Sequence, residues 1–159
     1  MNLSCHRTQK SFFIALSAIC LFAFPSYAEP EAEIEPNDNY NDSGVFEVTW
    51  NADLTLSNLS KAEATGDIDS TDNDWYVFQL NEGERVQITA WQLTGDLVPS
   101  LKLYVDPTAS HEEGNSHGGP GTNARIEEYI ATVTGNHYLR IARFNGAGTY
   151  QLQFLKTLN

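Results

Sequence analysis

Short runs of alternating hydrophobic and polar residues, separated by glycine or asparagine turns, dominate the chain beyond its N-terminal part. In residues 85–91, for example, Val86 and Ile88 alternate with Gln87 and Thr89. A period of two places every second side chain on the same face of a β-strand. The pattern therefore predicts strands that each bury one face.

About eight strands of this kind are expected from the spacing of the runs and turns. The runs are residues 45–50, 54–59, 75–80, 85–91, 101–105, 125–133, 137–144 and 150–154. Glu127 and Glu128 interrupt one alternation, and a β-bulge there would let Ile126 and Tyr129 share a face. No helical period is convincing after residue 28. The pattern predicts an all-β fold, namely an antiparallel β-sandwich of the jelly-roll or Greek-key type.

The N-terminus has the features of a secretory signal peptide. Arg7 and Lys10 precede an apolar run over residues 12–24, and small residues, Ser26 and Ala28, precede the expected cleavage site. So short an apolar run is typical of a signal sequence rather than a membrane anchor. We therefore expect residues 1–28 to be removed from a bacterial protein that is exported to the periplasm or the medium, with no membrane insertion afterwards.

The composition indicates how the exported chain is stabilised and which classes of partner it can bind. Both cysteines, Cys5 and Cys20, lie within the expected signal, so the exported chain would have no disulfide. A chain of 159 residues with 41% hydrophobic and 19% charged residues is typical of one globular domain. The net charge of −12 repels phosphate groups, which argues against nucleic-acid binding and favours cations as small partners.

Acidic residues are concentrated in two short segments. Residues 29–42 form an acidic arm with two prolines and no basic residue, ahead of the expected sandwich domain over residues 43–159. Residues 67–74 read D-I-D-S-T-D-N-D. Oxygen ligands at alternate positions suit Ca²⁺, although the glycine and glutamate of an EF-hand are absent. A solvated linker and a solvated acidic turn are the alternatives for the two segments.

The sequence has no motif that indicates an enzyme. His111 and Glu112 begin a zinc-protease-like pattern, but Asn115 stands where that pattern requires the second histidine. The G-x-S-x-G turn of serine hydrolases is also absent. A metal shared by His111, Glu112 and His117 stays open as an alternative, and we expect the protein to be non-catalytic.

A series of motifs covers most of the chain from Glu33 to Phe154. They are E-I-E-P-N-D at 33–38, G-D-I at 66–68, D-N-D-W-Y-V-F-Q-L at 72–80, E-G at 82–83, L-K-L-Y at 101–104, N-A-R-I at 123–126, G-N-H-Y-L-R-I at 135–141 and G-T-Y-Q-L at 148–152. In this order they resemble the bacterial pre-peptidase C-terminal (PPC) domain family, which is similar to the collagen-binding domains of bacterial collagenases.

The resemblance implies a β-sandwich with a calcium site where the acidic arm folds back on the loop before residues 75–80. Carried over by position, the implied ligands are Glu33, Glu35, Asn37, Asp72 and Asp74. The carbonyl oxygen of Trp75 is a further candidate. Asp38 and Asp69 are second-rank candidates, because each also suits a surface acid or a turn cap.

The combined prediction is a secreted, calcium-stabilised, non-catalytic binding or accessory module that acts on an extracellular protein or polysaccharide. The alternative is a structural or interaction partner of another exported protein, such as a protease, with purely architectural calcium. By the same alternation Trp91, Tyr104 and Tyr138 face outward, and beside Lys102 and Arg140 they are candidates for stacking on a sugar or a peptide. Ordinary cross-strand packing is the other explanation, since a sandwich has two outer faces.

Overall fold

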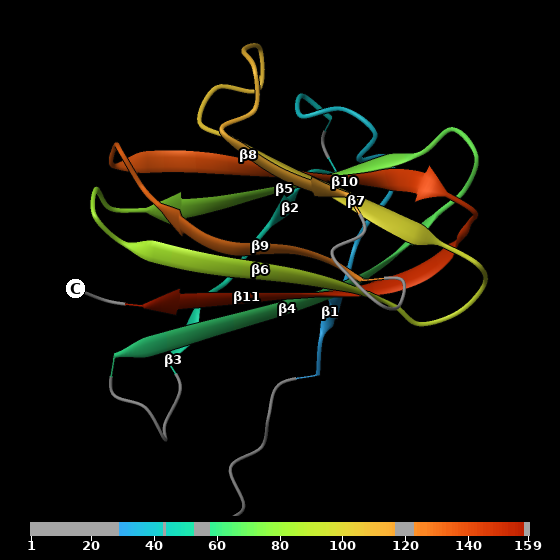
Figure 1. Ribbon diagram of the computed structural model, residues 1–159, viewed down its shortest axis with the longest axis horizontal. Helices are drawn as coiled ribbons and strands as arrows, with labels where there is room; N and C mark the ends of the chain where they lie inside the picture. Colours follow the sequence, from blue (N-terminus) through green and yellow to red (C-terminus); the bar gives the residue numbers. More distant parts are fainter. Residues whose placement is uncertain (1–28, 43, 53–57, 117–122, 158–159) are drawn as a thin grey trace, which may run out of the picture.

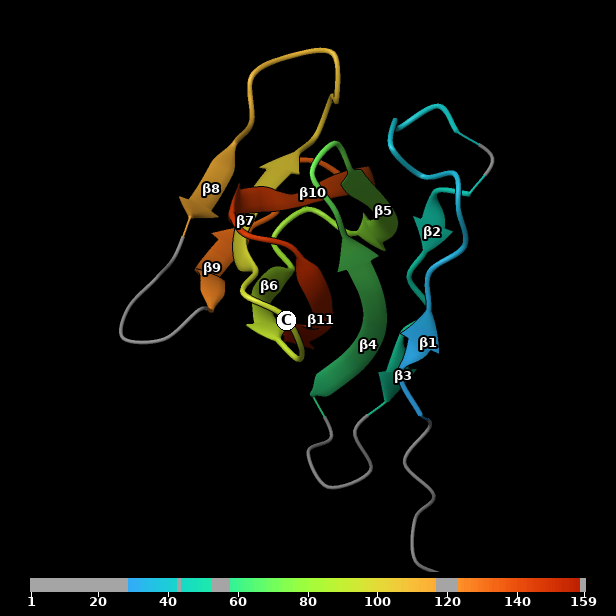
Figure 2. The ribbon, with the colours of Figure 1, turned by 90° about the vertical axis from the view of Figure 1, so that its right-hand side faces the viewer.

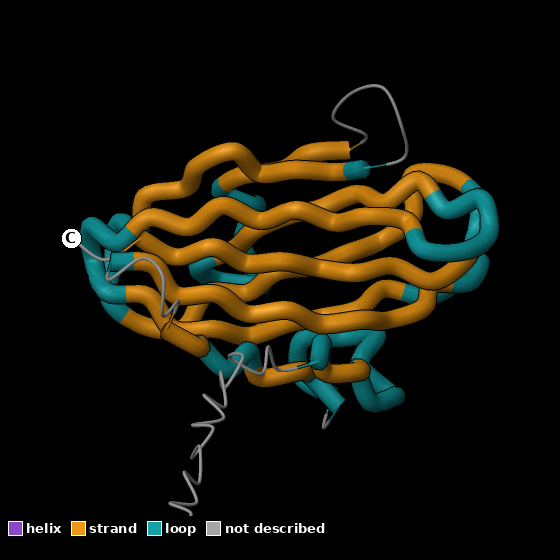
Figure 3. Tube along the Cα trace, turned by 90° about the horizontal axis from the view of Figure 1, so that it is seen from below, coloured by secondary structure: helices purple, strands orange, loops and turns teal. Residues whose placement is uncertain are grey.

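The computed structural model describes residues 29–42, 44–52, 58–116 and 123–157. These residues form two β-sheets packed face to face, and none of them is helical (Figures 1 and 3). The predicted all-β sandwich is confirmed. No helix within these ranges has the length and apolar character needed to cross a membrane. The expected signal peptide lies outside the described residues.

The first sheet has six strands in the order β1-β4-β11-β6-β9, with β3 also paired to β4. Its strands are β1 (Glu31–Ala32), β3 (Asn51–Ala52), β4 (Leu59–Ile68), β6 (Arg85–Gln92), β9 (Ala124–Ile130) and β11 (Gly148–Thr157). The second sheet has five strands in the order β2-β5-β10-β7-β8. Its strands are β2 (Phe46–Glu47), β5 (Asn73–Leu80), β7 (Val98–Tyr104), β8 (Glu113–Ser116) and β10 (Gly135–Asn145).

Six of the eight predicted runs coincide with β5, β6, β7, β9, β10 and β11, and the run over residues 45–50 contains β2. Residues 54–57 of the run over residues 54–59 lie outside the described residues. Strand β8 was not predicted, and neither was β4. Strand β4 spans Leu59–Ile68, and only Leu59 of the predicted run lies within it. The positions of β4 that face the core include Ala62 and Ala64, whose side chains are small. Small inward residues weaken the hydrophobic alternation, so the sequence pattern did not identify this central strand.

The predicted bulge in β9 is present. Val86 of β6 is opposite Tyr129, and Ile88 is opposite Ile126, so two steps along β6 correspond to three along β9. The extra residue lets both Ile126 and Tyr129 enter the core, where they are 4% and 6% exposed. The core between the sheets is filled by such alternating residues, including the fully buried Tyr76 and Phe154.

The acidic arm closes one edge of the sandwich. At this edge β4 belongs to one sheet and β5 to the other, and residues 69–72 connect them. Strand β1 pairs in parallel with β4, whereas β2 pairs in parallel with β5, so the chain between β1 and β2 passes from one sheet to the other (Figure 2). Both acidic segments of the sequence therefore meet at the same edge.

Candidate metal centre

The backbone pairing of the arm positions its acids over the open edge. The Glu33 N–H donates to the carbonyl oxygen of Thr65 (2.9 Å), which continues the β1–β4 pairing by one residue. On the other side, Asp74 lies two residues before Tyr76, so both side chains point from β5 toward the inside of the sandwich. Asp74 and Asn37 are both 0% exposed.

Ligand oxygens from the arm and from the β4–β5 connection form two overlapping groups. Glu33, Glu35 and Asp74 each offer an oxygen within 4.8 Å of the others, and the same holds for Glu35, Asp38 and Asp72. Glu35 belongs to both groups. Because all these donors are carboxylate oxygens, the arrangement suits a hard cation such as Ca²⁺.

Asn37 joins the groups through the arm itself. Its side-chain Nδ2 donates to Glu33 Oε2 (2.9 Å), and its backbone N–H donates to Glu35 Oε2 (3.1 Å). The structure thus brings the five predicted ligands to one place, and their role as metal ligands stays a prediction. Of the second-rank candidates, Asp38 lies in the second group.

Asp69 lies outside both groups and caps its own turn. Its Oδ1 accepts hydrogen bonds from the N–H of Thr71 (2.8 Å) and from the Thr71 hydroxyl (3.2 Å). This is a common side-chain to backbone pattern of aspartate in turns. The ring of Trp75, next to Asp74, turns to the outer face of the five-stranded sheet.

Two tyrosines that were not predicted complete the inner side of the site. The Tyr150 hydroxyl lies 2.5 Å from Asp74 Oδ2, 3.1 Å from Glu33 Oε2 and 2.6 Å from the Tyr76 hydroxyl. A tyrosine hydroxyl has one proton, so Tyr150 cannot donate to both carboxylates at once. Tyr76 could have been inferred from its spacing to Asp74, but the sequence contains no local signal for Tyr150.

Two buried oxygens at the site have no hydrogen-bond partner among the described residues. They are Asn37 Oδ1 and Asp74 Oδ1, and both belong to fully buried side chains. A buried polar oxygen without a partner destabilises a fold by about 1–3 kcal/mol. Coordination of a cation would satisfy both oxygens, so this observation favours a metal ligand role more than the clustering of acids does.

Burial, together with neighbouring acids, raises the pKa of several carboxyl groups at the site. Burial and the neighbouring charge of Glu33 together raise the pKa of Asp74 to about 10, and burial is the larger cause. Burial also raises the pKa of Asp72 to about 7, with a contribution from its hydrogen bond to Asp38. The pKa of Glu35 is raised by burial and by nearby acids. A divalent cation would oppose these shifts because it favours the charged carboxylates.

Gly66 on β4 forms the wall behind Glu33. A Cβ atom at this position would overlap the Tyr150 hydroxyl and the Glu33 carboxylate. The next residue, Asp67, donates its backbone N–H to Glu33 Oε1 (2.6 Å). The G-D-I motif therefore provides close approach and a backbone donor, which explains a glycine within a strand.

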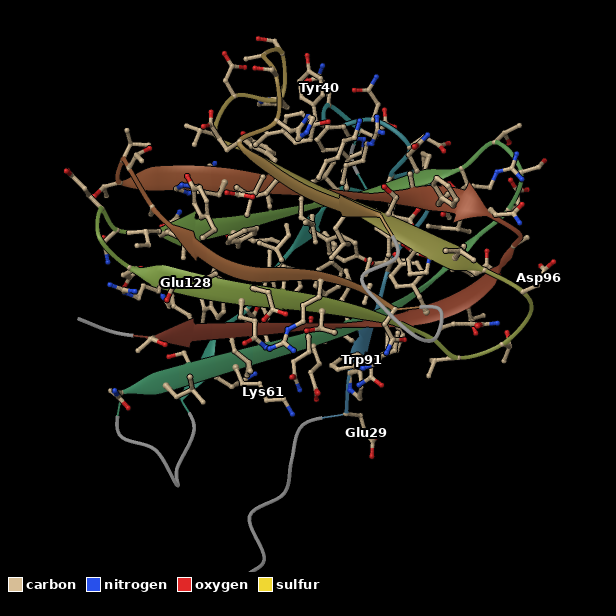
Figure 4. The ribbon with its side chains drawn as sticks, in the orientation of Figure 1. Glu29, Tyr40, Lys61, Trp91, Asp96 and Glu128 are labelled. Atoms are coloured by element: carbon tan, nitrogen blue, oxygen red, sulfur yellow. The ribbon has the colours of Figure 1, made fainter. Side chains whose placement is uncertain are left out.

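The three aromatic residues predicted to face a ligand do not form one surface. Trp91 belongs to β6 of the six-stranded sheet, whereas Tyr104 and Tyr138 are direct partners on β7 and β10 of the other sheet. Figure 4 shows Trp91 far from Tyr40, which lies against Trp75 of the five-stranded sheet. Local alternation correctly indicates the direction of a side chain but not the sheet that its strand joins.

Tyr104 is also less accessible than expected, since it is only 7% exposed. Its ring contacts those of Trp75 (5.3 Å between centroids) and His111 (6.1 Å), which cover it on the outer face. Tyr138 and Trp91 are half-buried. His111 and Glu112 are exposed, and His117, the third residue of the alternative metal set, lies outside the described residues.

No protein-family model matches this sequence, and no curated protein matches it. Among solved structures, the PPC domain of collagenase from Bacillus anthracis is 16% identical, with a TM-score of 0.49 over 80% of this chain and 98% of that chain. The chain is similar to a PPC domain. That domain is from the family whose motifs the sequence resembles, and at this identity the likeness concerns the fold alone.

Two periplasmic inhibitors of g-type lysozyme are also similar. The PliG protein of Aeromonas hydrophila is 7% identical, with a TM-score of 0.48 over 81% of this chain and 100% of that chain. The PliG protein of Salmonella Typhimurium is 16% identical, with a TM-score of 0.42 over 70% of this chain and 98% of that chain.

Proposed function

We propose that this protein is an exported, non-catalytic binding module whose acidic arm is held to the sandwich by calcium. The observation that carries the proposal is the convergence of the predicted ligands around two buried oxygens, Asn37 Oδ1 and Asp74 Oδ1, which no described residue hydrogen-bonds. Calcium would be held by Glu33, Asp74 and their neighbours, and it would supply positive charge that neutralises the crowded carboxylates.

Calcium is favoured over other cations by the donor set. Carboxylate and amide oxygens are hard ligands, whereas zinc and copper sites usually include imidazole or thiolate groups. Calcium accepts a large and irregular set of oxygens, while Mg²⁺ requires a tight octahedral shell and loses its water reluctantly. A site assembled from the arm and a turn, with its oxygens in an irregular arrangement, suits the less demanding ion.

Export and the class of partner rest on the sequence features. The signal-like N-terminus and the PPC-like motifs support a bacterial protein that acts outside the cytoplasm. The proposed partner is an extracellular protein or polysaccharide, and the alternative is a partner of another exported protein with architectural calcium. A pull-down with the exported form, against exported proteins and cell-surface polysaccharides, separates the two.

The intact mass of the exported protein tests the expected signal cleavage, and it should correspond to a chain that begins at Glu29.

Thermal unfolding in calcium and in chelator tests the metal site. Extracellular modules bind calcium at about 10⁻⁴ to 10⁻³ M, so millimolar calcium should stabilise the fold by about 1 kcal/mol. In a domain of this size the melting temperature should rise by a few degrees, on the order of 4 °C. Limited proteolysis should cut the arm more slowly in calcium, because docking orders its backbone.

Asp74→Ala should abolish both effects of calcium. Glu113→Ala is the matched control, since Glu113 is an exposed carboxylate on β8 at the opposite edge of the five-stranded sheet. The proposal fails if wild-type melting curves in calcium and chelator coincide while the arm is cleaved equally fast in both. Equal calcium effects in Asp74→Ala and wild type would place the ion elsewhere.

A further inference from the structure

The cations of the two sheets differ in their partners. In the six-stranded sheet, each of four cations forms an ion pair with a glutamate, namely Lys61 with Glu63, Arg85 with Glu128, Arg125 with Glu127 and Lys156 with Glu84. In the five-stranded sheet, Lys102, Arg140 and Arg143 have no ion pair with any described residue. The protein has a net charge of −12, so three cations without an acidic partner are unexpected, and two of them, Lys102 and Arg140, are neighbours.

Lys102 and Arg140 lie directly opposite each other on β7 and β10. The neighbours of Arg140 along its strand, Leu139 and Ile141, are fully buried, so Arg140 points to the outer face. Like charges at directly opposite positions of an antiparallel pair destabilise the sheet. The Arg140 Nε is moreover buried, with no hydrogen-bond partner in the described part of the chain. Both features would be relieved by an anion.

Aromatic side chains surround this pair of cations. Trp75 is directly opposite Arg140 on the other side of β10, and its ring meets that of Tyr104 from β7 with centroids 5.3 Å apart. Tyr138 is the direct partner of Tyr104. On the β8 side the position opposite Lys102 is Gly114, and the His111 ring lies close to this glycine. Lys102 itself is half-buried, so part of its side chain stays accessible to a partner.

We propose that the outer surface around Lys102 and Arg140 docks a carboxylate-rich segment of another exported protein. The inference rests on the proposed binding function and specifies the partner. A guanidinium fork recognises a carboxylate through two parallel hydrogen bonds. Arginine, tyrosine and tryptophan are the residues most enriched where proteins bind each other tightly. Because the rest of this protein repels acids, the local positive charge selects where an acidic partner lands.

The arm borders the same surface. Tyr40 packs edge-on against Trp75, with ring centroids 5.7 Å apart. The calcium concentration is therefore kept the same in every sample of the binding experiment, so that the position of the acidic arm does not differ between samples.

The experiment measures fluorescence anisotropy of a labelled synthetic peptide of alternating glutamate and tyrosine, at low ionic strength, with the full exported chain. Lys102→Gln and Arg140→Gln should each weaken binding about tenfold or more. Arg85→Gln is the matched control, because it removes the same charge from the six-stranded sheet, and it should change binding less than about twofold. Added salt should weaken wild-type binding. Lys102→Gln should melt no lower than wild type, because the like-charge pair is relieved.

Several results would overturn the inference. These are no binding of the peptide by wild type, equal binding of a glutamine-for-glutamate peptide, or equal effects of Lys102→Gln and Arg85→Gln. Selective binding of polygalacturonate instead of the peptide would assign the surface to an acidic polysaccharide and refute the protein partner. Should Arg140→Gln fail to fold, Lys102→Gln alone decides. In the pull-down, equal capture of one exported ligand by wild type, Lys102→Gln and Arg85→Gln would refute this inference only. No capture of any ligand by wild type would refute the proposed binding function.

Discussion

Tyr150→Phe removes a hydroxyl group that connects three side chains of the candidate metal centre. The hydroxyl contacts Asp74 at 2.5 Å, Tyr76 at 2.6 Å and Glu33 at 3.1 Å. The Tyr150 ring is 0% exposed, and phenylalanine keeps its shape. The substitution therefore tests the hydrogen bonds without opening a large cavity.

The size of the effect depends on the charge of Asp74. In calcium, Asp74 is expected to be ionised, and a hydrogen bond to a charged group contributes about 1.5–3 kcal/mol. In chelator, the pKa of about 10 keeps Asp74 largely protonated near neutral pH. A bond between neutral groups contributes about 0.5–1.5 kcal/mol. We therefore expect Tyr150→Phe to lower the melting temperature in both conditions, on the order of 5–10 °C in calcium and less in chelator.

The difference between the destabilisation by Tyr150→Phe in calcium and that in chelator measures the effect of the hydroxyl group on calcium binding. A difference of about 1 kcal/mol corresponds to a loss of about fivefold in calcium affinity. Differential scanning calorimetry gives the stabilities, and isothermal titration calorimetry gives the affinity. Tyr138→Phe is the control, because the Tyr138 hydroxyl has no hydrogen bond to a described residue, and its change should stay within about 0.5 kcal/mol. Equal destabilisation by Tyr150→Phe in calcium and in chelator would refute the link to the metal.

Three further predictions concern the same edge and the core. Gly66→Ala should remove calcium stabilisation in melting experiments, because the new methyl group displaces Glu33 and Tyr150; calcium dependence like that of wild type would contradict this. Calcium affinity measured by titration calorimetry should increase from about pH 6 to pH 8, because Asp72, with a pKa of about 7, and Asp74, with a pKa of about 10, must lose their protons to bind; a flat profile would show that neither carboxyl is a ligand. Burial lowers the pKa of His137, with its hydrogen bond to Gly135 acting in the opposite direction. Because its pKa is lowered, His137 binds a proton more weakly in the folded state than in the unfolded state. The contribution of neutral His137 to the free energy of unfolding is therefore fully present above about pH 6.5 and declines below it. Urea midpoints at about pH 7.5 and 5.5 should fall more steeply in wild type than in His137→Gln, and parallel falls would contradict the assignment.

The sequence by itself determined the class of fold and the residues at the arm and the acidic turn. Alternation with a period of two is a local property, so it indicated the buried faces and even the bulge that lets Ile126 and Tyr129 share a face. The candidate ligands came from the resemblance to the PPC family, which rests on short, contiguous motifs such as E-x-E-P-N-D and D-x-D-W-Y, and their role at a metal stays a prediction.

Tertiary structure alone decided which distant residues share a site. Tyr150 reaches Asp74 across 76 positions of sequence, and no local pattern encodes that contact. Trp91 and Tyr138 face outward as expected, yet their strands joined different sheets. Side-chain direction follows from the geometry of one strand, whereas the choice of sheet and neighbours follows from how the whole chain buries its apolar faces.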